Sequence, residues 1–243
     1  MLPFVMEKVN QWLLVPEVEE DIKNSIREAS EEVLNDCFSE ELAFGTGGLR
    51  GILDFGTNRM NVYTVRKATQ GLADYLNSTT FPKRTAIAYD SRIHSYDFAV
   101  AAAEVLAGSN IEVFIYPRLE PTPALSFAVR DQKCGAGVCI TASHNPAKYN
   151  GYKVYGPDGC QITLQVANEI QRAIAQVEMF TGIKRLPFES GLATGMIHYL
   201  EDDVLDRFVQ TELSLVQYQA DELSDLSIVY TPLNGTGFEC VTT

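Results

Sequence analysis

The chain has 243 residues, of which 46% are hydrophobic, and its formal net charge is −13. This length fits one large domain, or one domain with part of a second, and the apolar content allows a sizeable core. The acidic balance argues against nucleic acid or an anionic membrane as the main partner. The five cysteines form no Cys-x-x-Cys pair, and no long apolar run begins the chain, so we expect a cytoplasmic protein without a disulfide framework.

The first quarter of the chain predicts helices separated by a glycine-rich loop. Hydrophobic periodicity favours helices over residues 3–14 and 17–38, with Pro16 between them. Residues 44–61 contain five glycines and are expected to form a loop, which at this length in a compact domain is usually functional. A further helix is predicted over residues 62–76.

The middle of the chain alternates between short buried strands and helices. The predicted strands cover residues 85–89, 111–116 and 136–140, and the helices between them cover residues 96–106 and 123–130. This β-α-β-α-β rhythm predicts an α/β fold, in which a mixed, mostly parallel sheet is flanked by helices.

The last third of the chain indicates a change of unit. We expect a strand over residues 151–155, a helix over 163–182, an aperiodic boundary over 186–195, a new unit from 197, a helix over 202–215 and a strand over 226–230. The prediction is therefore a first α/β domain over residues 1–190 and the start of a second, truncated α/β domain over residues 191–243. Since the last strand leads into no further sheet, the chain is expected to be an N-terminal piece whose partner is the remainder of its own polypeptide.

The segment Thr141-Ala142-Ser143-His144-Asn145-Pro146 is the strongest candidate for chemistry. It follows a predicted buried strand, at the edge of the sheet where α/β folds bind ligands, and Asn-Pro imposes a turn. Ser143 lacks the Gly-x-Ser-x-Gly context of hydrolases, but a serine can accept and return a phosphoryl group with little more than positioning and charge neutralisation. The alternatives are a turn serine that satisfies backbone groups and a structural His144.

Basic residues elsewhere indicate an anionic ligand. The segment Gly45-Thr46-Gly47-Gly48-Leu49-Arg50-Gly51 has the character of an anion-binding loop, because glycines let backbone N–H groups approach phosphate and Arg50 can grip it with two hydrogen bonds. The fingerprints for ATP and NAD fail here. Lys153 can face the same cleft as Ser143, its alternative being an exposed strand lysine. Asp90-Ser91-Arg92 is a weaker candidate, which a plain strand-to-helix turn also explains.

Taken together, these motifs resemble the α-D-phosphohexomutases. Residues 141–146 are similar to the phosphoserine loop of that family, residues 150–155 to the segment that follows it, and residues 44–51, 57–60 and 63–67 to the N-terminal signature of its bacterial phosphoglucomutase members. The resemblance implies that phosphorylated Ser143 donates its phosphoryl group to glucose 1-phosphate or glucose 6-phosphate. The resulting glucose 1,6-bisphosphate, intermediate and activator, would turn over and return its other phosphate to Ser143.

The resemblance also implies roles for the remaining residues. Arg50 and Lys153 would stabilise the transferring phosphate, and His144 would assist proton transfer. Mg²⁺ would be the cofactor, with phosphoserine 143 as one of its ligands. The residues expected to bind the phosphate of the small-molecule sugar phosphate are Thr46, Gly47, Arg50, Asn145 and Lys153.

Three elements of the family pattern are missing from the sequence. These are the Asp-Gly-Asp-x-Asp metal loop, the Gly-Glu sugar-recognition loop and the Arg-Ser-Gly phosphate loop; Glu201-Asp202-Asp203 lacks the spacing of the first. We therefore expect these elements on later domains, and the 243 residues to be inactive alone. Phosphomannomutase, phosphopentomutase or bisphosphate synthase activity remains open, as does a non-catalytic phosphosugar-binding module.

Overall fold

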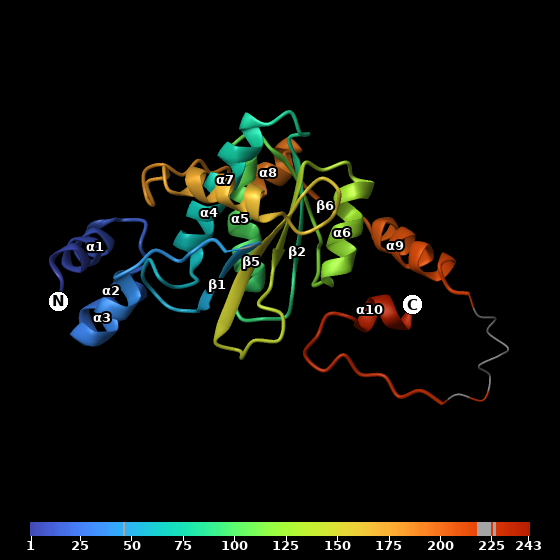
Figure 1. The fold of residues 1–243 in the computed structure, drawn as a ribbon, viewed down its shortest axis with the longest axis horizontal. Coiled ribbons are helices and arrows are strands. Elements are labelled where there is room, and N and C mark those ends of the chain that lie inside the picture. Colours follow the sequence, from blue (N-terminus) through green and yellow to red (C-terminus); the bar gives the residue numbers. More distant parts are fainter. Residues whose placement is uncertain (46, 218–224, 226) are drawn as a thin grey trace.

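The computed structural model describes residues 1–45, 47–217, 225 and 227–243. Within these residues a six-stranded sheet has the order β1-β5-β4-β2-β3-β6 (Figure 1). The strands are β1 (Gly48–Ile52), β2 (Arg84–Tyr89), β3 (Glu112–Ile115), β4 (Ala136–Ile140), β5 (Tyr149–Tyr155) and β6 (Ile197–Tyr199). Strands β4, β2, β3 and β6 pair in parallel, whereas β5 and β1 add antiparallel at one edge. The predicted α/β class with a mixed, mostly parallel sheet is thereby confirmed.

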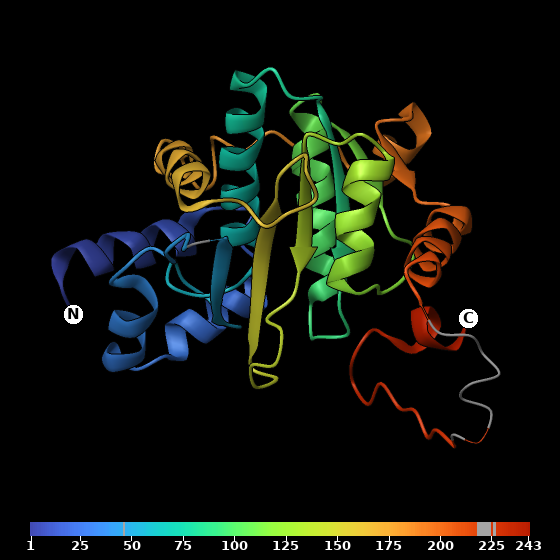
Figure 2. The ribbon, with the colours of Figure 1, turned by 45° about the vertical axis from the view of Figure 1, so that its right-hand side comes forward.

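Helices cover both faces of the sheet (Figure 2). One core lies under α4 (Val62–Ser78), α5 (Ser95–Gly108), α7 (Leu164–Ile174) and α8 (Phe188–Thr194), and the opposite core under α6 (Thr122–Asp131) and α9 (Asp202–Ser214). Strand β2 serves both cores because successive side chains alternate: Ile87 enters the first, and Ala86 and Ala88 the second. In the described part of the chain, no helix has the length and apolar character needed to cross a membrane.

The N-terminal helices form a third cluster around Trp12, which is 1% exposed. These helices are α1 (Pro3–Leu14), α2 (Glu20–Glu28) and α3 (Glu31–Phe38). The Trp12 ring meets the rings of Phe38 and Tyr63 edge-on, with centroids 5.5 and 5.1 Å away. The single helix predicted over residues 17–38 is wrong: Ser30 is extended and accepts a 3.3 Å hydrogen bond from the Val33 N–H, so it caps a separate helix.

Part of the glycine-rich segment, predicted to be a loop, forms a strand because it pairs with a distant strand. The loop predicted over residues 44–61 contains β1, whose five residues pair antiparallel with β5. Burial alternates along β1, with Leu49 buried and Arg50 exposed, as a half-covered edge strand requires. The glycines that predicted a loop here instead allow a strand to lie close to its neighbour.

The end of the sheet also differs from the sequence prediction. The helix predicted over 163–182 ends at Ile174, and the segment 186–195, predicted to be aperiodic, contains α8. Residues 197–199 do not start a new sheet, because Val113 of β3 pairs with Ile197 of β6 in parallel. The sheet thus continues past residue 190, and the division into two domains stays a prediction.

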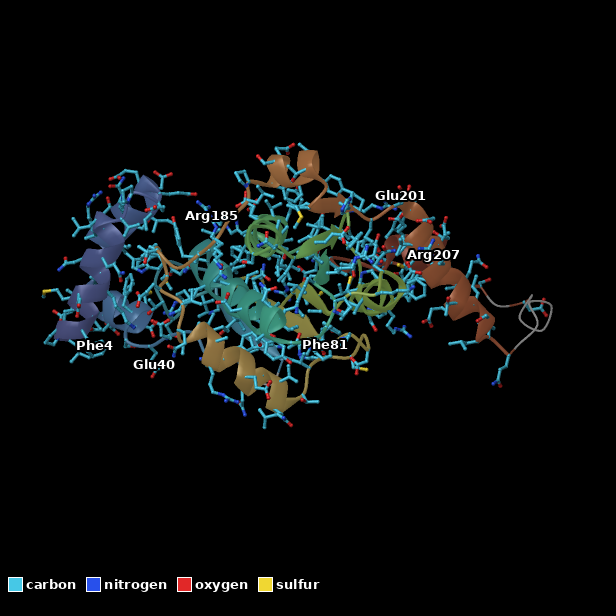
Figure 3. The ribbon with its side chains drawn as sticks, turned by 90° about the horizontal axis from the view of Figure 1, so that it is seen from above. Phe4, Glu40, Phe81, Arg185, Glu201 and Arg207 are labelled. Atoms are coloured by element: carbon cyan, nitrogen blue, oxygen red, sulfur yellow. The ribbon has the colours of Figure 1, made fainter. Side chains whose placement is uncertain are left out.

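Helix α9, near the end of the chain, packs against α6. Arg207 lies on α9 (Figure 3), and its ion pair of 2.6 Å with Asp131 joins this helix to the end of α6. Residues 227–230 form no strand, contrary to prediction, and Leu226 lies outside the described residues. A short helix, α10 (Phe238–Thr242), follows.

Candidate functional site

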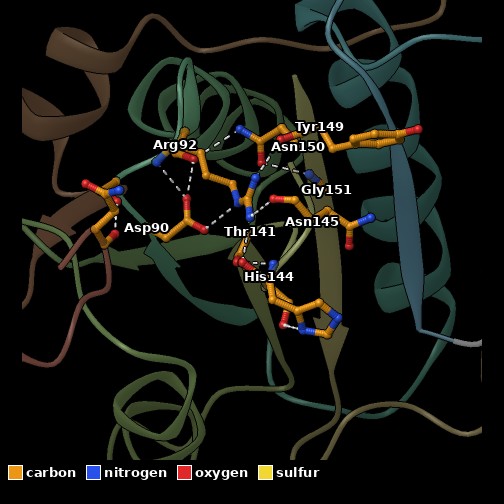
Figure 4. Close-up of polar contacts among 12 residues, drawn as sticks. Asp90, Arg92, Thr141, His144, Asn145, Tyr149, Asn150 and Gly151 are labelled. Atoms are coloured by element: carbon orange, nitrogen blue, oxygen red, sulfur yellow. Dashed lines mark hydrogen bonds and ion pairs between the residues drawn. The ribbon is translucent and has the colours of Figure 1, made fainter. Parts of the chain in front are cut away.

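Ser143 lies in the loop that leaves the carboxyl end of β4 and returns as β5. Its side chain is exposed, and its backbone is left-handed, with φ of 57°. The Ser143 N–H donates to Thr141 Oγ1 at 2.9 Å, and Ser143 Oγ lies 3.3 Å from His144 Nδ1 (Figure 4). The hydroxyl is therefore accessible, with an imidazole nitrogen within hydrogen-bonding reach.

A cleft of about 1070 Å³ opens beside this loop. Ser143, His144 and Asn145 line it together with residues 90–93 and 119–123, which follow β2 and β3. Residues 232–236 line it as well. The carboxyl ends of three neighbouring parallel strands thus meet at one cleft, where an α/β sheet is expected to bind its ligand.

A smaller pocket of about 300 Å³ holds the two predicted phosphate-binding cations. Gly47, Arg50 and Lys153 line it, and Thr141 lines both this pocket and the Ser143 cleft. Arg50 pairs with Gly151, two residues before Lys153 on β5, so both cations lie on the same face of the β1–β5 pair. Thr46 lies outside the described residues.

Two glycines explain how three backbone segments come so close. Gly48 has φ of 145°, and a Cβ there would lie 1.8 Å from the carbonyl oxygen of Tyr152. A Cβ on Gly151 would lie 2.5 Å from the carbonyl oxygen of Thr141. Because neither residue has a side chain, β1 and the start of the Ser143 loop can both approach β5, which brings Arg50 and Thr141 to one pocket.

Arg92 has a larger part in the site than the sequence pattern indicated. It is 13% exposed, pairs with Asp90 at 3.3 Å, and directs its guanidinium at the backbone of the Ser143 loop (Figure 4). An acid and an arginine two residues apart after a buried strand were the signal, but the partner segment lies 51 residues away from Arg92. Nothing in the local pattern identifies that partner.

Glu120 is a second residue of the cleft that the sequence did not single out. Its side chain is fully buried, and the Cys240 thiol donates to Oε2 at 3.5 Å. Burial, followed by the charge of Glu239, raises the pKa of Glu120 to about 7. Arg118 lies 3.7 Å away but forms shorter ion pairs with Glu239 and Asp202, so it compensates this buried carboxyl only in part.

The side chains around Ser143 supply few of the oxygen ligands that Mg²⁺ needs. In the ranges that the structure describes, no three His, Cys, Asp or Glu side chains converge on a common point. Asp202 and Asp203 form ion pairs with Arg118 and Arg207. Since Mg²⁺ needs several oxygen ligands in octahedral geometry, the Ser143 hydroxyl does not make a magnesium site by itself.

Comparison with known proteins identifies a family and relatives that this sequence matches. A family model described as phosphoglucomutase/phosphomannomutase, alpha/beta/alpha domain I, matches residues 41–180. A phosphoglucomutase from Staphylococcus saprophyticus is 34% identical over 97% of this chain, and one from Staphylococcus aureus is 39% identical over 85% of it. The chain spans only 41% and 37% of the lengths of these two relatives.

Solved structures show the same architecture. A proposed phosphomannomutase from Thermus thermophilus superposes with a TM-score of 0.63 at 26% identity, over 78% of this chain and 39% of that one. The open form of a Paramecium phosphoglucomutase, parafusin, has a TM-score of 0.61 at 18% identity, over 82% of this chain and 40% of that one, which supports the fold alone. With the family model matching more than half of its length, this chain belongs to the phosphoglucomutase/phosphomannomutase family.

Proposed function

We propose that this chain is the phosphoserine-bearing part of a phosphoglucomutase, which interconverts glucose 1-phosphate and glucose 6-phosphate through glucose 1,6-bisphosphate. The observation that carries the proposal is the exposed Ser143 hydroxyl, held in a left-handed turn at the mouth of a cleft of about 1070 Å³. A cleft of this size accommodates a hexose bisphosphate. The names of the two staphylococcal relatives favour glucose over other sugars.

The chemistry divides into two phosphoryl transfers. In the first, the P–Oγ bond of phosphoserine 143 breaks while a bond forms between the phosphorus and a sugar hydroxyl oxygen. The sugar hydroxyl loses its proton and the Ser143 oxygen gains one, which His144 is placed to carry because its Nδ1 lies 3.3 Å from Oγ. In the second transfer the bisphosphate, bound the other way round, returns its other phosphoryl group to Ser143 by the reverse of these steps.

Positive charge for these transfers comes from the adjoining pocket. Arg50 and Lys153 line it beside Thr141, which also borders the cleft, so a phosphate there gains two cationic partners. Arg50 offers paired N–H groups and Lys153 a compact charge, a combination suited to a phosphate whose charge is spread over three oxygens. Gly47 and Asn145 are proposed as further phosphate contacts. Gly47 lines the small pocket and Asn145 lines the cleft, and Thr141 borders both.

The remaining parts of the activity are assigned to the rest of the polypeptide. Mg²⁺ would supply further charge neutralisation to the phosphoserine, with carboxylate ligands from outside these 243 residues. We expect the chain alone to be inactive as a mutase, and we place it in the cytoplasm, in keeping with five free cysteine thiols. Phosphomannomutase or phosphopentomutase activity, or a binding module without catalysis, are the competing functions.

Intact-mass analysis after incubation with glucose 1,6-bisphosphate tests the proposal. We expect one added phosphate on the chain, its loss in Ser143→Ala, and its retention in Ser91→Ala, a matched control because Ser91 lines the same cleft. Binding of glucose 1-phosphate with no phosphate on Ser143 would favour the binding module instead. Robust mutase turnover by residues 1–243 would contradict the expected inactivity.

A further inference from the structure

The guanidinium of Arg92 gathers four backbone carbonyl groups of the Ser143 loop. Nη2 donates to the carbonyl oxygen of Ser143 at 2.6 Å and to that of Asn145 at 2.7 Å. Nη1 donates to the carbonyl oxygens of Pro146 and Tyr149, each at 3.1 Å. One side chain thus spans the turn from Ser143 to the start of β5 (Figure 4).

Asp90 holds this guanidinium in place. Its Oδ2 forms an ion pair with Arg92 Nε at 3.3 Å, while the four carbonyl contacts are made by Nη1 and Nη2. Its Oδ1 accepts from the Arg92 backbone N–H at 3.0 Å and from Ser95 Oγ at 2.7 Å. The Asp90 N–H in turn donates to the carbonyl oxygen of Ile140 at 3.1 Å, which ties the pair to the end of β4. Through Asp90, the arginine is therefore also tied to the end of the sheet, at the last residue of β4.

Asn150 connects the same two segments from the far side of the loop. This residue is fully buried, and its Nδ2 donates to the carbonyl oxygen of Ile93 at 2.9 Å and to Ser95 Oγ at 3.0 Å. Its Oδ1 accepts from the Gly151 N–H at 2.7 Å. Both ends of the loop are thus bound to the segment that follows β2. Arg92, from the same segment, binds the part of the loop between these ends.

The conformation held in this way is one that a serine rarely adopts. Ser143 has φ of 57°, where the Cβ of an L-residue crowds its own backbone, so the conformation needs support from its surroundings. Four hydrogen bonds from a charged donor supply that support. Lysine has a single ammonium with three donors and does not reproduce a planar fork that serves four carbonyl acceptors and an ion pair with Asp90.

We propose that Arg92 is the positioning residue of the Ser143 loop: it gathers four carbonyl groups so that Ser143 keeps its left-handed backbone and presents its hydroxyl to the cleft. This inference rests on the proposed phosphoserine function and adds a residue that acts through the backbone of the Ser143 loop. A misplaced nucleophile is costly in such a reaction, because displacement by about 1 Å can lower the rate about 10²-fold.

The test measures Ser143 phosphorylation by glucose 1,6-bisphosphate in the 243-residue chain and its variants. We expect Arg92→Ala and Arg92→Lys to slow the reaction by about 10²-fold, and millimolar guanidinium to restore Arg92→Ala, since the free ion can occupy the vacated fork site. Arg172→Ala is the control, because that arginine is exposed on α7 and its Nε donates to the carbonyl oxygen of Asn168 in its own helix, away from the Ser143 loop. Arg92→Lys carries the test if Arg92→Ala does not fold.

A second readout does not depend on phosphate transfer. Lys148 is exposed within the loop, so trypsin cleavage after it reports how firmly the loop is held. We expect both Arg92 variants to be cut faster there and at the wild-type rate elsewhere. If the wild-type chain takes up no phosphate, that result bears on the proposed function and not on Arg92, and this cleavage alone decides the role of Arg92.

Two results would overturn the inference. One is phosphorylation and cleavage at wild-type rates in both Arg92 variants. The other is a slowed reaction that guanidinium does not restore, accompanied by faster cleavage throughout the chain, because this would mean a general loss of structure.

Discussion

Gly48 is the position at which the glycine-rich segment depends most on having no side chain. In Gly48→Ala the new Cβ would begin 1.8 Å from the Tyr152 carbonyl oxygen, whereas ordinary contacts start near 3.4 Å, so β1 has to move by the difference of roughly 1.6 Å. The φ of 145° adds backbone strain of about 1–3 kcal/mol. Loss of the hydrogen bond from the Val154 N–H to the Gly47 carbonyl, now 2.9 Å, adds about 1 kcal/mol.

These contributions predict a loss of about 2–4 kcal/mol in the free energy of unfolding, measured by urea titration with circular dichroism. If β1 detaches locally instead, the Val154 amide exchanges its hydrogen faster and the global loss is smaller. Gly45→Ala is the control: its Cβ would meet the nearest atom at 3.8 Å, so we expect a change within about 0.5 kcal/mol. Equal stability and equal Val154 exchange in the two variants would refute this account of the close β1–β5 contact.

Two further predictions concern the N-terminal cluster and the buried carboxyl of the cleft. Trp12→Ala should cost about 3–5 kcal/mol of unfolding free energy by circular dichroism, while Leu14→Ala, 80% exposed, should be nearly neutral; similar losses in both would contradict the packing of α1. The pKa of Glu120 rises from its ordinary 4.5 to about 7 on folding, so the stability it contributes is complete below pH 4.5 and disappears as the pH rises through 7. Wild type should therefore lose stability relative to Glu120→Gln over that interval, and parallel pH profiles of the two proteins would show that Glu120 ionises as freely as in the unfolded chain.

Much of the architecture followed from local pattern. The buried strand at residues 136–140 and the helix at residues 3–14 were predicted with the bounds that the structure has, because short β-branched runs and a continuous helical period are local signals. Where the prediction failed, a competing local interaction decided: the Ser30 cap divided one predicted helix into two. The strand β1 failed for the opposite reason, since its glycines predict a loop until a neighbouring strand is present to pair with them.

Some residues of the candidate site could likewise be predicted from local sequence, and others could not. Ser143, His144 and Asn145 are neighbours in the chain, so the sequence by itself determined that a hydroxyl, an imidazole and an amide share one turn after a buried strand. The sequence also determined the α/β class, because alternating strands and helices allow few other packings.

Only the tertiary structure decided what surrounds that turn. Arg50 reaches the pocket of Lys153 through antiparallel pairing across about a hundred residues of chain, and Arg92 binds a loop 51 residues away. Glu120 becomes a buried acid because Cys240 and Glu239 pack beside it. Periodicity records which side of its own element a residue occupies, but the identity of the facing backbone is set by long-range strand pairing and packing, which a local pattern does not contain.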